Sequence, residues 1–248
     1  MATALPAPGI RGPSARHVAA DTDHPGAVWH PSPNFGPRRH GRPPDLIMLH
    51  YTAMATPDAA LERLCDPEPP GGLGPVSAHY LVCPAGRVWQ MVREADRAWH
   101  AGAGAWGEVT DVNSHSIGIE LANTGAEPFS EPQMSALESL LRDVLDRTGI
   151  APAAVIAHSD SAPGRKVDPG PRFDWLRLAR QGLAAWAAPA GAGGNFHDDL
   201  AAIGYRLPEG DDPDCLLQSF RLRFRPWGRG PLTEADARMA RGLAAAVS

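Results

Sequence analysis

Two histidines and one aspartate have the residue types and positions of a catalytic metal site. His50 and His158 each follow directly on an apolar run typical of a buried strand, and Asp168 lies in a loop ten positions after His158. Two imidazoles and one carboxylate are the ligand set of a catalytic zinc site, because three protein ligands leave the fourth tetrahedral position for water. These residues are far apart in the sequence, so only the fold can bring them together. A hydrogen-bonded loop or core histidine is the plainer alternative for each imidazole.

Short apolar segments are expected to carry the two histidines on strands. The run from Asp45 to His50 predicts a buried strand whose last side chain emerges at the edge of a sheet. Residues 153–157 predict a second buried strand, which ends just before His158. Both imidazoles are therefore expected where a strand gives way to a loop.

Two further segments predict strands by their alternation and their turns. Residues 116–121 alternate with a period of two, which places Glu120 on the face opposite the apolar side chains of that strand. Residues 78–82 and 87–92 predict a hairpin, because the connector between them has the composition of a turn.

Three helices are predicted between and after these strands. Thr56 and Pro57 are typical of an N-cap and the first position of a helix. The clearest helix spans about 131–147, where apolar residues repeat every three and four positions after Ser130 and Gln133 in capping-box spacing. Residues 173–188 predict another helix. The fold class that follows is α/β, with a central mixed β-sheet flanked by helices.

The 248 residues divide into four predicted segments. Residues 1–44 are rich in Pro, Gly, His and Arg and are expected to form an extended arm, wrapped on the domain or partly disordered. Residues 45–188 are expected to form the catalytic domain, and 189–194 a linker. Residues 195–248 are too few for a comfortable independent core and predict a compact three-helix module packed on that domain.

Composition excludes several classes of partner. The formal net charge is −5 and no basic tract stands out, so nucleic acid is not an expected partner. The sequence holds no run of 18 uninterrupted apolar residues, so no membrane span is expected. The three cysteines are widely spaced, which fits a reducing compartment. With no signal-like N-terminal segment, a cytoplasmic location is expected, and export to the periplasm or cell envelope is the alternative.

Five ordered segments make this sequence similar to a known family. They are LHYTA at 49–53, SAHYL at 77–81, AWHAG at 98–102, NSHSIGIE at 113–120 and HSDSAPGRKVDPG at 158–170. Their order resembles that of the zinc-dependent N-acetylmuramoyl-L-alanine amidases, which are similar in fold to peptidoglycan recognition proteins. The C-terminal residues resemble, more loosely, a shortened peptidoglycan-binding module. A helical cap that only stabilises the catalytic domain is the alternative for this segment.

The amidase resemblance implies a cofactor, a reaction and a role for each motif residue. His50, His158 and Asp168 would hold Zn²⁺, Glu120 would be the general base, and Lys166 would stabilise the oxyanion. The bond cut would join N-acetylmuramic acid, in its 1,6-anhydro form or not, to L-alanine of a stem peptide. The partners would be peptidoglycan fragments, that is muropeptides, in recycling or wall turnover.

The same motifs suggest residues that contact the substrate. Trp99 and His100 lie in a loop expected to line a sugar-peptide groove, although Trp99 could equally pack within the loop. Tyr80 could contact substrate or, equally, pack within the protein. Asn113 could bind a peptide backbone or form an Asx turn, and Arg165 could meet a stem-peptide carboxylate or be solvated. We assign His79, by contrast, to structure.

Two rival functions remain open from the sequence. Recognition relatives that lack the third ligand bind wall fragments without cutting them, but Asp168, Glu120 and Lys166 are all present here. A different zinc amide hydrolase would keep the metal and lack a groove for the sugar.

Overall fold

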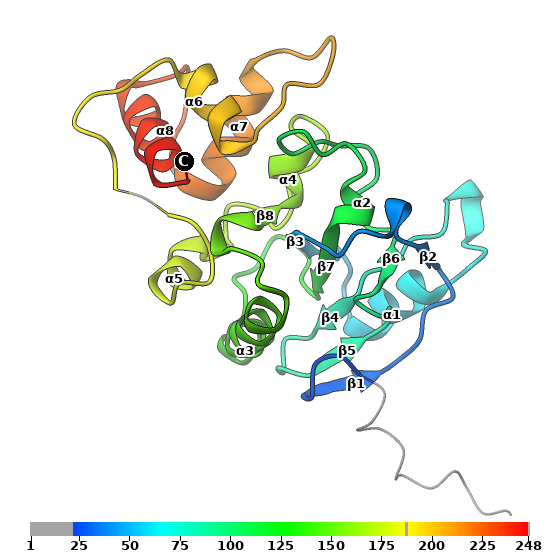
Figure 1. Ribbon diagram of the computed structural model, residues 1–248. Helices are drawn as coiled ribbons and strands as arrows, with labels where there is room; N and C mark the ends of the chain where they lie inside the picture. Colours follow the sequence, from blue (N-terminus) through cyan, green and yellow to red (C-terminus); the bar gives the residue numbers. More distant parts are fainter. Residues whose placement is uncertain (1–21, 187, 248) are drawn as a thin grey trace, which may run out of the picture.

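A six-stranded mixed β-sheet forms the centre of the chain, with strands in the order β1–β5–β4–β7–β3–β8 (Figure 1). The computed structural model describes residues 22–186 and 188–247, so the first part of the predicted arm, residues 1–21, lies outside it. β4, β7, β3 and β8 pair in parallel, whereas β5 is antiparallel to β4. The strands are β1 Ala27–Trp29, β3 Leu46–Tyr51, β4 Tyr80–Val82, β5 Val88–Gln90, β7 Ser116–Leu121 and β8 Val155–Ala157. The predicted mixed sheet and the hairpin β4–β5 are confirmed.

Helices cover both faces of this sheet and continue past its β8 edge (Figure 1). The α-helices are α1 Pro57–Cys65, α2 Val112–His115, α3 Glu131–Thr148, α4 His158–Ser161, α5 Trp175–Arg180, α6 Phe196–Ile203, α7 Asp214–Phe224 and α8 Glu234–Val247. Short 3₁₀ turns lie at Arg39–Gly41, Pro70–Gly72 and Pro152–Ala154. The predicted α/β class is confirmed.

One face of the sheet packs against α3 and α5. The odd-numbered residues of β7 point to this face, where they join apolar side chains of α3 in the largest core cluster. α3 begins where Ser130 Oγ accepts a hydrogen bond from the amide of Gln133, as the cap spacing predicts. The Gln133 amide group does not complete the capping box, however. It donates instead to the carbonyls of Val82 and Ala122 and so ties α3 to β4 and β7.

The opposite face of the sheet carries the polar residues of interest. Its β4 side is covered by α1, whose N-cap Thr56 accepts from the amide of Ala59 as predicted. Its β3 and β8 side packs against Ala101 and Val112. Between these two apolar clusters lie the even-numbered positions of β7, so Glu120 points away from the α3 core as the alternation predicted.

Two predicted segments differ from the structure. The sheet begins at β1, which pairs with β5, and not at Asp45, so the second half of the arm belongs to the folded domain. β2 (Phe35–Pro37) likewise pairs with β6 (Asp96–Ala98) in a separate two-stranded sheet. Strands of three residues are too short to show a periodic pattern, which is why composition alone suggested an arm.

The helix predicted over 173–188 is much shorter than expected. The Asp174 carboxylate accepts from the amide of Arg177, so α5 begins at Trp175. It ends at Arg180, because Gly182 has a φ of 71°, in the left-handed region that a helix cannot continue through. Leu183, which follows the end of α5, is nevertheless buried in the main core.

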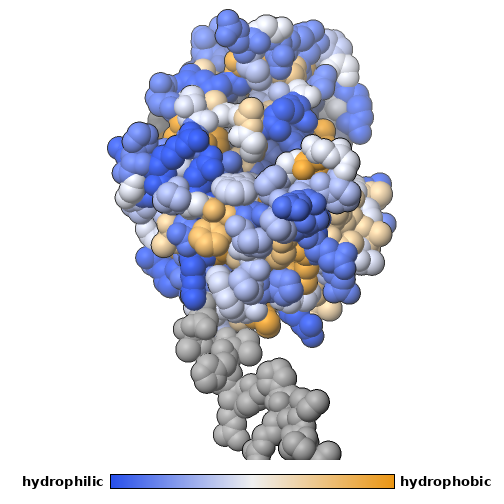
Figure 2. All heavy atoms as spheres, turned by 90° about the vertical axis from the view of Figure 1, so that its right-hand side faces the viewer, coloured by the Kyte–Doolittle hydropathy of each residue, from blue (hydrophilic) through white to orange (hydrophobic). Residues whose placement is uncertain are grey.

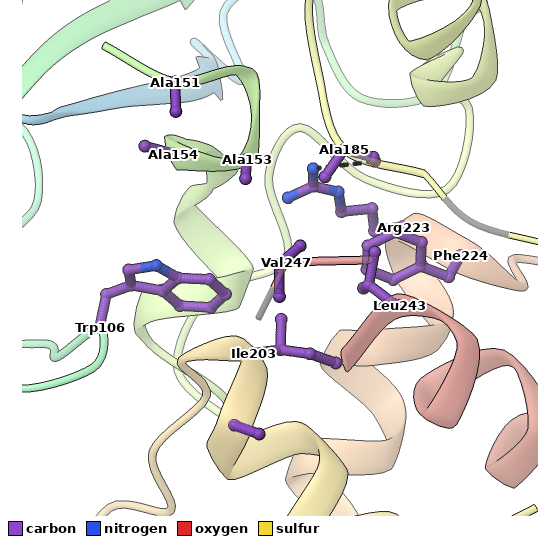
Figure 3. A pocket seen from close by; sticks show the side chains of 11 residues that line it. Trp106, Ala151, Ala153, Ala154, Ala185, Ile203, Arg223, Phe224, Leu243 and Val247 are labelled. Carbon is purple, nitrogen blue, oxygen red and sulfur yellow. Dashed lines mark hydrogen bonds between the residues drawn. The ribbon is translucent and has the colours of Figure 1, made fainter. Parts of the chain in front are cut away.

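The predicted three-helix module is confirmed as α6, α7 and α8, which gather at one end of the molecule (Figure 1). It has its own apolar core, formed by residues such as Phe196, Leu200 and Phe220. A cavity of about 220 Å³ separates part of it from the catalytic domain, with Trp106 on one side and Ile203 on the other (Figure 3).

A buried ion pair joins this module to α4. Arg223 donates to Asp160 Oδ2 at 2.8 Å, and the Tyr205 hydroxyl donates to Asp160 Oδ1 at 2.5 Å. The Arg223 guanidinium also lies 4.0 Å from the centre of the Trp175 ring. The module is therefore attached to α4 through polar contacts with Asp160, which lies two residues after His158.

On the face shown in Figure 2, hydrophilic residues dominate and the hydrophobic areas are small and separate. Within the described residues, no helix combines the length and the apolar character needed to cross a bilayer.

Candidate metal centre and active site

Three predicted ligand atoms lie within hydrogen-bond distance of one another. His50 Nδ1 is 3.0 Å from His158 Nδ1 and 2.9 Å from Asp168 Oδ2, and His158 Nδ1 is 3.0 Å from the same oxygen. His50 lies near the end of β3, while His158 opens α4 directly after the adjacent strand β8. Parallel pairing thus brings both imidazoles to one edge of the sheet. In the described part of the chain, no other group of His, Cys, Asp or Glu has this arrangement.

The hydrogen bond on the far side of His158 determines which of its nitrogens is free. His158 Nε2 lies 2.9 Å from the carbonyl oxygen of Ala101. A carbonyl can only accept, so Nε2 carries a proton, and in the tautomer with that single proton the lone pair is on Nδ1. That lone pair points toward His50 and Asp168.

His50 reaches the same state through a longer chain of contacts. The Ser116 hydroxyl donates to the Val112 carbonyl at 2.6 Å, so its oxygen must accept from His100 Nε2 at 3.2 Å. His100 Nδ1 is then bare and accepts from His50 Nε2 at 3.0 Å. His50 Nδ1 is consequently left with a lone pair as well.

His50 and Asp168 are in the protonation states that a metal ligand requires. Burial lowers the pKa of His50 to about 4, so the ring is neutral at pH 7. Burial opposes ionisation of Asp168, but its contacts with His158 and His50 outweigh burial and hold the pKa of that carboxyl well below its usual range. Two lone pairs and a carboxylate facing one another repel unless a cation lies between them. This donor set fits Zn²⁺, with three protein ligands and room for a fourth.

Glu120 lies beside this cluster and is held in an unusual state. It is the register partner of His50 on the neighbouring parallel strand, so both side chains point to the same face. Burial and the negative charge of Asp168 raise the pKa of Glu120 to about 8, against the opposing charge of Lys166. Its Oε2 is buried with no hydrogen-bond partner among the described residues. Such a carboxyl group can accept and return a proton near neutral pH.

Lys166 is brought to the site as the motif implied. It is half-buried, and its positive charge acts on both Glu120 and His50. Its backbone amide donates to the carbonyl of Ala162, which fixes the turn that leads to Asp168.

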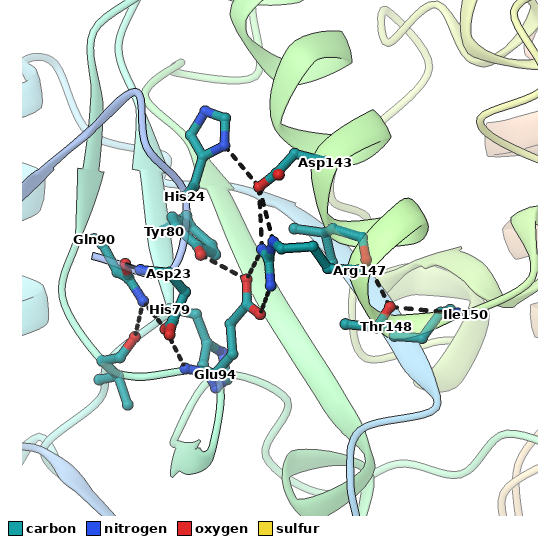
Figure 4. A network of polar contacts seen from close by, with 12 residues as sticks. Asp23, His24, His79, Tyr80, Gln90, Glu94, Asp143, Arg147, Thr148 and Ile150 are labelled. Carbon is teal, nitrogen blue, oxygen red and sulfur yellow. Dashed lines mark hydrogen bonds and ion pairs between the residues drawn. The ribbon is translucent and has the colours of Figure 1, made fainter. Parts of the chain in front are cut away.

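Tyr80 does not line the site, contrary to the expectation from the sequence. It is fully buried in the α3 core, and its hydroxyl donates to Glu94 Oε1 at 2.6 Å. Glu94 in turn is bound by both terminal nitrogens of Arg147 (Figure 4). Alternation along β4 sends Tyr80 to the face opposite Glu120, because the two occupy adjacent register positions.

His100 and Asn113 also differ from their predicted roles as groove residues. His100 lies behind His50, on the side away from the other ligands. Asn113 is buried, and its Oδ1 accepts from the amides of His100 and Ala101 at 3.0 and 2.9 Å. Both residues contact the protein itself. A short loop without periodicity does not reveal which way its side chains point.

Arg165 and Trp99 lie at the rim of the site. Arg165 donates to the carbonyls of Ala101, at 2.9 Å, and Ala103, so it secures the loop that follows Trp99. Trp99 is half-buried, and its contact with substrate stays a prediction. His79 is structural as expected: the ring is buried, and its Nδ1 accepts from the amide of Gly118.

No pattern in the sequence indicates the role of Arg38. Its buried guanidinium donates to the carbonyls of Glu94, Ser114 and Ser116 at 2.8–3.0 Å and so holds the start of β7. An isolated arginine in a Pro-rich segment carries no signal of such a contact. Gly118 was also missed: a Cβ there would lie 2.5 Å from His100 Cγ.

Comparisons with known proteins show which family this chain resembles. The family profile of N-acetylmuramoyl-L-alanine amidases matches residues 40–171. N-acetylmuramoyl-L-alanine amidase AmiD of Escherichia coli K12 is 37% identical over 217 residues, which are 73% of this chain and 75% of that protein. The 1,6-anhydro-N-acetylmuramyl-L-alanine amidase AmpD of the same strain is 32% identical over 165 residues, 62% of this chain and 90% of AmpD.

Solved structures show the same likeness. Escherichia coli AmiD in complex with the substrate anhydro-N-acetylmuramic acid-L-Ala-D-gamma-Glu-L-Lys superposes with a TM-score of 0.73 at 33% identity, over 84% of this chain and 91% of that chain. AmpDh3 from Pseudomonas aeruginosa gives a TM-score of 0.72 at 30% identity, over 84% of this chain and 94% of that chain.

Proposed function

This chain belongs to the N-acetylmuramoyl-L-alanine amidase family of hydrolases, and we propose that it uses Zn²⁺ to cleave the amide bond between N-acetylmuramic acid and L-alanine of a stem peptide. The 1,6-anhydro form of the sugar is included, because relatives are named for it and the AmiD complex contains it. The substrates are muropeptides, met in recycling or in wall turnover.

One observation carries the proposal. Two bare imidazole nitrogens and a carboxylate oxygen converge within 2.9–3.0 Å of one another, and the Glu120 carboxyl group lies on the adjacent strand with a raised pKa. A metal ligand set with a proton acceptor beside it is the arrangement expected in a metal-dependent hydrolase. A protein that only binds muropeptides needs no proton acceptor at this position.

Glu120 and Lys166 have different roles in the proposed hydrolysis. When bound, Zn²⁺ polarises the scissile carbonyl and makes water a nucleophile near neutral pH. Glu120 takes a proton from the attacking water and later delivers it to the nitrogen of L-alanine as the C–N bond breaks. The Lys166 ammonium stabilises the negative charge on the carbonyl oxygen. A donor of this kind contributes about 2.7–4 kcal/mol of transition-state stabilisation.

The test is release of peptide from a defined muropeptide. The purified chain is incubated with anhydro-N-acetylmuramic acid-L-Ala-D-γ-Glu-L-Lys before and after dialysis against a chelator, and again after Zn²⁺ is restored. We expect mass spectrometry to show free tripeptide and free sugar acid in the first and third samples alone. Binding of the muropeptide without cleavage would support the recognition-protein alternative, and cleavage after complete metal removal would defeat the zinc mechanism.

The role of the C-terminal module and the compartment follow from the same proposal. The contacts of Asp160 with Tyr205 and Arg223 favour a module that stabilises the catalytic domain, and binding of peptidoglycan by it stays a prediction. A cytoplasmic location also stays a prediction, which subcellular fractionation tests.

A further inference from the structure

His100 lies behind His50 and makes the contact that determines the orientation of this ligand. We propose that His100 is a positioning residue for the metal site, acting through His50 Nε2. The proposal rests on the Zn²⁺ site described above and deepens it. His100 itself touches no other member of the ligand set, because its Nδ1 is occupied by His50 and its Nε2 by Ser116.

The hydrogen bonds that link His50, His100 and Ser116 all run in one direction. This series of hydrogen bonds ends at the carbonyl of Val112, which can only accept, and the hydroxyl of Ser116 can donate only once. Every proton along Ser116, His100 and His50 is therefore assigned from that end. A ligand histidine whose second nitrogen donates to a fixed acceptor is held in one tautomer and one ring orientation.

The space for the His100 ring is also built into the fold. The ring packs over β7 at Gly118, where a Cβ would lie 2.5 Å from His100 Cγ. It lies edge-on to the His50 ring, with centroids 5.1 Å apart. Glycine in the middle of a strand is unfavourable, so its presence here fits the need to admit this ring.

The same loop serves both imidazole ligands. His100 accepts from His50 with its side chain, and the next residue, Ala101, accepts from His158 with its carbonyl. A single oxygen, Asn113 Oδ1, holds the amides of both loop residues. The loop is thus a common support for the two rings, and His100 is its one side-chain contact to a ligand.

Zinc affinity tests the proposal without reference to activity. The variants are His100→Ala, which removes the acceptor, and His100→Asn, whose Oδ1 occupies nearly the position of Nδ1 and can accept from His50. His115→Ala is the matched control, because His115 precedes β7 and pairs with Asp45 at the surface. Zinc affinity is measured by competition with a chromophoric chelator, and the melting temperature of each metal-free variant shows that it folds.

We expect His100→Ala to bind Zn²⁺ about 10- to 100-fold more weakly than the natural chain, the usual effect of losing such a partner. His100→Asn should recover most of this loss, and His115→Ala should not differ from the natural chain. If His100→Ala does not fold, Ser116→Ala is used instead. It removes the hydroxyl oxygen that accepts from His100 and should cause a smaller loss of zinc affinity.

Two results would overturn the inference alone. The first is unchanged zinc affinity in folded His100→Ala, or in Ser116→Ala where that variant replaces it. The second is a folded His100→Asn variant that binds Zn²⁺ no better than His100→Ala. A natural chain that takes up no Zn²⁺ would instead overturn the proposed metal site and this inference with it.

Discussion

His50 and Glu120 lie side by side in register on the parallel strands β3 and β7. Their side chains therefore point to the same face of the sheet, one as a neutral imidazole and the other as a carboxyl group with a raised pKa. A metal ligand and a proton acceptor are thus placed together by the backbone pairing of two strands. This arrangement makes the two roles separable by mutation.

Replacement of Glu120 by Gln should abolish turnover and leave the metal in place. The amide has nearly the same shape but cannot take a proton, and general-base catalysis contributes about 10²- to 10⁴-fold to rate. The check is kcat for peptide release together with zinc content by atomic absorption. Equal loss of zinc and activity would show that Glu120 acts as a ligand.

Glu120 should also make the stability of the metal-free chain depend on pH. Its pKa is about 8 in the folded chain and about 4.3 when unfolded, so the neutral form is favoured by folding. The stabilising contribution is fully present below pH 4 and is lost as pH rises toward 8. Ionised Glu120 is then buried at a cost that Glu120→Gln avoids.

The measurement compares melting temperatures of the natural chain and Glu120→Gln, both with chelator. We expect the variant to gain several degrees relative to the natural chain between pH 5 and pH 8.5. A difference that stays constant over this interval would show that the pKa of Glu120 is not raised.

The ion pair between Arg223 and Asp160 should dominate the attachment of the C-terminal module. Arg223→Met leaves a fully buried carboxylate without its cation, which typically costs about 3–5 kcal/mol. Arg206→Met is the matched control, because Arg206 also joins the module to the catalytic domain but pairs with the exposed Glu108, and such pairs contribute about 0–1 kcal/mol. Chemical denaturation of both variants gives the two values, and similar losses would contradict this assignment.

Tyr80→Phe should lower stability and leave substrate affinity unchanged. Loss of the hydroxyl removes the hydrogen bond to buried Glu94, at a cost of about 1–3 kcal/mol. KM for the muropeptide should not change, because Tyr80 lies across the sheet from Glu120. A rise in KM without loss of stability would show that Tyr80 contacts the substrate.

Elements with strong local patterns could be predicted from the amino-acid sequence. β3 and β7 are each six residues long, and α3 repeats its apolar residues over 18 positions, so periodicity and capping were enough to place them. Alternation along β7 also placed Glu120 on the correct face. The chemistry of the ligand set followed from residue type, because His, His and Asp are suited to few tasks when brought together.

Which face of the sheet carries the site became clear from the folded chain. Alternation along β4 separates Tyr80 from its neighbours but does not say which face a ligand reaches. Pairing of β4 with β7 settles it, since Tyr80 adjoins Ile119 and not Glu120. The same is true of His100, whose ring direction depends on the space that Gly118 leaves on another strand. Contacts between segments distant in sequence have no local signature, so these roles became visible when the chain was folded.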